Sequence, residues 1–159
     1  MSDQILYSAK ISFHLPRGHD KPKGTAVNVI VATKSNGQGD INLAIRERFA
    51  KMETWKDDGQ HTYTYALDVL PVGLQEINGE MKTTIELEPN KSPVMFDYEL
   101  ALVFDDGDPM TAKTRLTQRR TGVLLDQTDR KFSSWHTLKK QSFMLNGAQS
   151  DWGNLLGQP

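Results

Sequence analysis

Apolar and polar side chains alternate along most of this chain, with the period of two that strands impose. Between residues 5 and 15 every second residue is apolar, and the residues between them are mostly polar. Because successive side chains of a strand point to opposite faces, this pattern predicts a half-buried strand. The same alternation predicts strands at residues 61–69, 81–88 and 94–104. Residues 25–33 are β-branched and apolar on both faces, which predicts a central, doubly covered strand.

The remaining segments are shorter or less regular. Residues 41–45 alternate again, and weaker strands are predicted at residues 111–118, 121–125 and 131–138, separated by segments rich in turn-forming residues. Residues 44–55 have two interpretations: a helix of two or three turns, or a continuation of the preceding strand through a bulge. About eight strands with at most one short helix predict an all-β fold, an antiparallel β-sandwich or a jelly roll.

The length and the limits of the alternation predict one domain. A chain of 159 residues is long enough to bury a substantial core. The alternation is lost near residue 145, so we assign residues 1–145 to a single sandwich domain and 146–159 to a tail. The tail contains Trp152, Leu155 and Leu156. It either docks on the domain or is a disordered end.

Composition excludes several classes of protein. The 19 basic and 20 acidic residues nearly cancel, which argues against a dedicated nucleic-acid-binding protein. The absence of cysteine excludes disulfides, thiolate metal sites and a cysteine nucleophile. No basic, apolar leader and no apolar run of membrane-spanning length occurs. We therefore expect a soluble protein, cytoplasmic by default, with export by another route left open.

No familiar catalytic signature occurs in the sequence. Phosphate-binding glycine loops, zinc-protease motifs, nucleophile elbows and EF-hand loops are all missing. The four histidines (His14, His19, His61 and His136) are scattered and share no metal-binding spacing. If the protein is an enzyme, its catalytic site must therefore be assembled by folding from residues that are distant in the sequence.

The densest acidic cluster is formed by Asp105, Asp106 and Asp108, at the end of the longest apolar strand. Three neighbouring carboxylates repel one another, and a hard cation such as Ca²⁺ relieves that repulsion by collecting their oxygens. The alternative is an ordinary hairpin turn, because Asp-Gly is a standard turn sequence and its carboxylates stay solvated. The cluster is thus a candidate calcium site or a turn.

Two further features are candidates for partner binding. Arg115, Arg119 and Arg120 belong to a basic last third of the chain and would suit a phosphate headgroup or an acidic partner. The alternative is a solvated edge strand that its charges protect from pairing. Trp55 precedes an acidic turn, where an exposed ring would stack on a sugar or lie in a membrane interface. Core packing is the commoner role of tryptophan.

Residues 55–67 (WKDDGQHTYTYAL) resemble the middle of a PLAT domain, the lipoxygenase-homology, C2-like sandwich. In that family an acidic, glycine-containing turn leads into a strand of alternating aromatic residues, as Tyr63 and Tyr65 do here. Residues 24–45 resemble the family's opening pair of strands. The usual acids after the first strand are replaced by RGHDK at residues 17–21, a departure that argues against calcium binding. The resemblance implies an accessory domain that binds membranes or protein partners.

These observations favour a non-catalytic binding module. It would recognise a membrane surface, a glycan or a protein partner through its end loops or a sheet face. One alternative is a structural subunit of a homo-oligomer or a larger assembly, in which apolar strands bury surface between protomers. Another is a small enzyme with a site assembled by folding.

Overall fold

The computed structural model describes residues 3–16, 20–35, 39–56, 59–77, 80–89, 92–137 and 139–144. This part of the chain is all-β, as predicted, and its one helix is the three-residue 3-10 turn η1 (Leu74–Glu76). The tail at residues 146–159 lies outside the described residues. The described residues form nine strands: β1 (Ile5–His14), β2 (Ala26–Ser35), β3 (Gly39–Phe49), β4 (Thr62–Val69), β5 (Glu80–Glu88), β6 (Val94–Asp105), β7 (Lys113–Leu125), β8 (Lys131–Thr137) and β9 (Lys139–Phe143).

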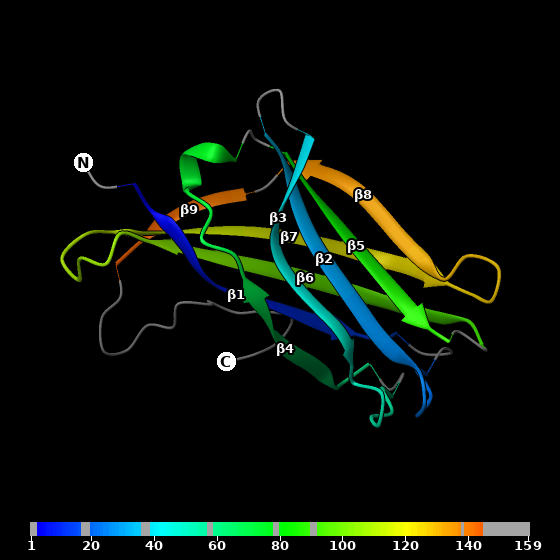
Figure 1. Cartoon of the computed structure of the whole chain (residues 1–159). Helices are drawn as coiled ribbons and strands as arrows, with labels where there is room; N and C mark the ends of the chain where they lie inside the picture. Colours follow the sequence, from blue (N-terminus) through cyan, green and yellow to red (C-terminus); the bar gives the residue numbers. More distant parts are fainter. Residues whose placement is uncertain are drawn as a thin grey trace.

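The strands pair antiparallel in the order β8-β5-β2-β3-β4-β1-β6-β7-β9 and curl into a sandwich-like fold. In Figure 1, β2, β3 and β5 cross in front of β6 and β7. The seam between β3 and β4 is short, with Ala44 paired to Val69 and Ile45 to Asp68. This seam divides the sheet into a first layer (β8, β5, β2 and β3) and a second layer (β4, β1, β6, β7 and β9).

The alternation of the sequence decides which residues fill the space between the layers. Every even-numbered residue of β6 from Val94 to Phe104 is buried, so the predicted register is confirmed. The facing residues of β5 are Met81, Thr83, Ile85 and Leu87, all fully buried. Burial of these apolar side chains is the main favourable term in folding.

Residues 44–55 form no helix; instead β3 continues to Phe49 and then turns. Between the pairs Val27–Phe49 and Val29–Arg46, β3 has two residues where β2 has one, which is a β-bulge. Pairing with β2 satisfies the backbone of β3, and it buries Leu43 and Phe49. This tertiary gain outweighs the weak helix propensity of the segment.

The predicted strands at 111–118 and 121–125 are one strand, β7, interrupted by a bulge of its own. Here β7 has two residues, Thr121 and Gly122, opposite Asp97 of β6. Gly122 adopts a φ of 69°, and its N–H donates to Asp97 Oδ1 at 2.9 Å. A glycine tolerates this left-handed conformation without steric cost, so the strand kinks instead of ending.

Candidate binding groove

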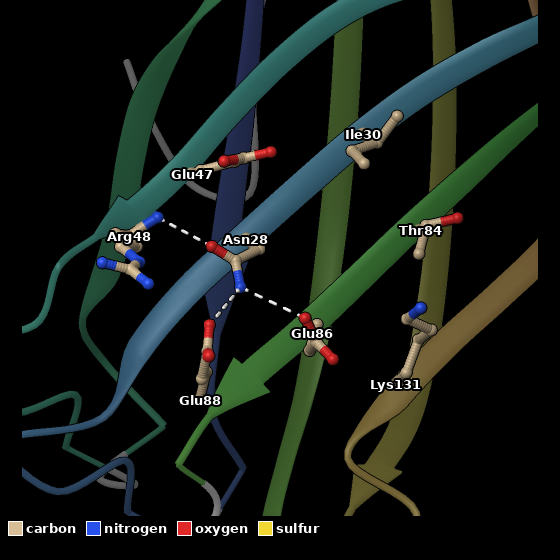
Figure 2. Close-up of a pocket in the computed structure, with 8 residues that line it drawn as sticks. All are labelled: Asn28, Ile30, Glu47, Arg48, Thr84, Glu86, Glu88 and Lys131. Carbon is tan, nitrogen blue, oxygen red and sulfur yellow. Dashed lines mark hydrogen bonds between the residues drawn. The ribbon is translucent and has the colours of Figure 1, made fainter.

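A shallow hollow lies on the outer face of the first layer, over β2, β3, β5 and β8 (Figure 2). Its volume is about 250 Å³. A second hollow of about 240 Å³ shares Arg48 and Glu88 with the first. We call the two together the outer groove. Its lining residues are Ala26, Asn28, Ile30, Glu47, Arg48, Lys51, Thr84, Glu86, Glu88, Pro89 and Lys131.

Asn28 of β2 organises the groove with one side-chain amide. Its Nδ2 donates to Glu86 at 3.2 Å and to Glu88 at 3.1 Å, both on β5. Its Oδ1 accepts a hydrogen bond of 2.7 Å from the backbone N–H of Arg48. The amide therefore fixes two carboxylates and the bulge of β3 at the same time, and all three bonds are visible in Figure 2.

The bulge of β3 determines which side chains reach the groove. Arg48 has a φ of 53°, a conformation that is uncommon outside glycine and costs about 1–3 kcal/mol. Glu47 and Arg48 are both exposed. Figure 2 shows Arg48 on one side of Asn28 and Lys131 on the other. Bulges concentrate next to binding sites because they re-aim side chains, and this one supplies a carboxylate and a guanidinium.

A polar row extends the groove along the same face. Thr84 Oγ1 and Ser133 Oγ lie 3.0 Å apart. Beyond them, Lys82 of β5 pairs in register with Trp135 of β8. The Nζ of Lys82 is 5.3 Å and that of Lys34 is 4.6 Å from the centroid of the Trp135 ring. This end of the face presents ammonium groups over an aromatic ring.

Sequence reasoning missed this groove because its residues are far apart along the chain. Asn28 and Glu86 are separated by 58 positions. The available signals were weak: a single asparagine inside a β-branched strand, and polar residues at every second position of β5. Neither indicates which strands pair.

The acidic cluster forms a turn. The Oδ1 atoms of Asp105, Asp106 and Asp108 each accept a bond from the backbone N–H two residues on, at 2.9 to 3.1 Å. Asp105 Oδ2 also lies 3.4 Å from Lys113 Nζ. Among the described residues, no three acidic or histidine side chains gather as a metal ion would require. The carboxylates thus serve the backbone of their own loop.

The three candidate arginines do not form one patch. Arg115 and Arg119 lie on one face of β7, opposite Val103 and Glu99 of β6. Arg120 lies on the other face, where its guanidinium is 5.0 Å from the centroid of the Phe132 ring. Alternation along the strand separates neighbouring residues in this way.

Trp55 is a core residue, which corrects the expectation of an exposed ring. It is completely buried, its ring stacks on Phe13 with centroids 4.6 Å apart, and its Nε1 donates to the Tyr65 hydroxyl at 2.8 Å. Burial raises the pKa of Tyr65, with Glu53 adding to the shift. A ring held on all sides by this cluster offers no surface to a partner.

Comparisons of the chain with protein-family models, curated proteins and solved structures gave no match. In the part of the chain that the structure describes, no helix is long and apolar enough to cross a membrane. The resemblance to PLAT domains therefore stays a prediction.

Proposed function

We propose that this protein is a non-catalytic binding module whose outer groove takes an extended, hydroxyl-rich ligand of the oligosaccharide class. One observation carries the proposal: two hollows lined by polar side chains share Arg48 and Glu88, so they lie next to each other on one face of the sheet. Asn28 holds the acceptors Glu86 and Glu88 in place, so these groups are positioned before a ligand arrives. Preorganisation of this kind reduces the entropy lost on binding.

The mixture of groups in the groove suits hydroxyls. Glu47, Glu86 and Glu88 accept hydrogen bonds, whereas Arg48 and Lys131 donate them. A sugar hydroxyl both donates and accepts, so it pairs with such a mixture. Arg130 Nε lies 3.7 Å from Glu86 Oε2 and further balances the acidic charge. Opposite charges in near balance give no preference for a strongly charged ligand.

The fold argues against a peptide added as a strand at this place. Both β2 and β5 are paired on either side, β2 with β3 and β5, and β5 with β2 and β8. Their backbone groups are therefore already bonded, while strand addition needs a free edge. A ligand must therefore contact the side chains of the groove, as sugars do in their binding sites.

The arrangement of carboxylates also favours binding over hydrolysis. Most glycosidases place two carboxylates on either side of the bond that breaks. Glu86 and Glu88 project from one face of one strand and share the Asn28 amide, so these two carboxylates lie side by side and do not face each other. This geometry supports recognition, and turnover of a bound sugar would contradict it.

Titration of the folded protein with a panel of soluble neutral and acidic oligosaccharides, followed by calorimetry and amide chemical shifts, tests the proposal. Arg48→Gly removes the guanidinium while keeping the left-handed backbone, so affinity should fall about tenfold, equivalent to about 1.4 kcal/mol, with stability preserved. Arg119→Gln, on the opposite layer, is the matched control and should bind normally. Failure of every oligosaccharide to shift groove resonances would refute the proposal.

A further inference from the structure

Lys21 is the most unusual charged residue of the described part of the chain, because it is completely buried. Lysine is almost never fully buried in proteins unless its charge is compensated. Its backbone is tied to Trp55 by two hydrogen bonds, one in each direction, both of 3.0 Å. No acidic group of the described residues forms an ion pair with it.

The compensation comes from backbone carbonyls. Four backbone oxygens lie within hydrogen-bonding distance of Lys21 Nζ and share its three N–H groups: those of Pro22 at 3.2 Å, Thr25 at 2.9 Å, Ala50 at 2.9 Å and Glu53 at 2.6 Å. The first two belong to the segment before β2, and the other two to the turn after β3. We call these four oxygens the carbonyl cage. On one side, the Trp55 ring centroid is 5.3 Å from Nζ, within cation–π range.

A set of neutral carbonyl oxygens is suited to a monovalent cation, since such oxygens replace its hydration shell. Divalent calcium prefers carboxylates. The carboxylate of Glu53, whose charge acts on Lys21, is bonded to the Tyr65 hydroxyl at 2.9 Å. Burial lowers the pKa of Lys21 to about 8, and the Glu53 charge opposes the shift. The amine is thus still protonated at neutral pH.

We propose that the carbonyl cage is a monovalent-cation site filled in cis by the Lys21 ammonium, which takes the place of a bound ion and joins the segment before β2 to the turn after β3. Without a cation, the buried carbonyl of Thr25 and the three partly buried ones would lose a donor, at a cost in stability. The proposal is independent of what the outer groove binds. It predicts that an alkylammonium ion from solution can replace the side chain.

Lys21→Ala removes a fragment equivalent to propylammonium. The melting temperature should fall by about 10 °C or more, and propylammonium chloride should recover several degrees of that loss in a concentration-dependent manner. Tetramethylammonium chloride at the same ionic strength should recover none, because it has no N–H to donate. Lys23→Ala, at an exposed position of the same segment, is the matched control and should show neither effect.

Lys21→Met fills the space of the aliphatic stem without supplying a donor. This variant should therefore be less stable than the wild type, and propylammonium should not raise its melting temperature. If Lys21→Ala does not fold, dilution from urea with and without propylammonium decides instead. A gain in native near-UV signal with the amine supports the cage, and no gain overturns it. Wild-type stability of Lys21→Ala, or equal effects of the two ammonium salts, would also overturn the proposal.

Discussion

A buried hydrogen-bonded chain joins the two layers and offers a sharp test of how they are held together. Thr83 Oγ1 of β5 donates to Gln118 Oε1 of β7 at 2.8 Å, and Gln118 Nε2 donates to the Tyr98 hydroxyl of β6 at 2.6 Å. All three residues are buried. Thr83→Val keeps the shape of the side chain but leaves Gln118 Oε1 without this donor. The free energy of unfolding should therefore fall by about 1–3 kcal/mol.

Tyr98→Phe should cost a similar amount, because Gln118 Nε2 then loses its acceptor. Replacing all three polar groups, as Thr83→Val with Gln118→Leu and Tyr98→Phe, leaves no partner unsatisfied, so its total cost should be below the sum of the single changes. Urea unfolding followed by the fluorescence of the buried Trp55 measures these values. A cost below about 0.5 kcal/mol for Thr83→Val, or strict additivity in the triple variant, would refute the reasoning.

A further prediction concerns an ionisable group. Burial raises the pKa of Tyr98 to about 12 from an ordinary value of 10.0, so the folded state keeps this proton between the two values and stability should be lost as pH rises from 10 to 12. Urea midpoints across this range check the loss. Calcium to millimolar levels should leave the melting temperature unchanged, because Asp106 and Asp108 already accept hydrogen bonds from the backbone of their own loop. A saturable increase in melting temperature that is abolished by Asp106→Asn with Asp108→Asn would contradict this prediction.

Local patterns were enough to predict most of the strands and the face that β6 buries, but not β9. In β6 every second residue meets the core, and a one-residue error would have exposed the whole apolar set. In β1 the predicted face is buried from Ala9 to Phe13, whereas Ile5 and Tyr7 are exposed, because the register shifts between Leu6 and Ser8. The turn at Asp105 to Asp108 was also within reach, because its hydrogen bonds span only two residues. Such features depend on neighbouring residues in the sequence, so the local sequence is enough to predict them.

Whether residues 44–55 form a helix or a strand depended on the strand with which they pair. Their composition is compatible with a helix, but β2 supplies the backbone groups that make them a bulged strand followed by a turn. Trp55 follows the same rule: its burial is decided by Phe13 and Tyr65, which arrive from β1 and β4. No property of the segment alone distinguishes an exposed tryptophan from this one.

The alternating sequence by itself determined that this chain is all-β and which face most of its strands turn to the core. Only the tertiary structure decided where its candidate sites lie. Asn28 meets Glu86 across 58 positions, and Lys21 meets the Glu53 carbonyl across 32. Strand pairing brings such groups within 3.2 Å of each other, and its energy comes from burying the whole core. Polar groups that are not part of the apolar pattern therefore take their positions from the strand pairing that this pattern drives.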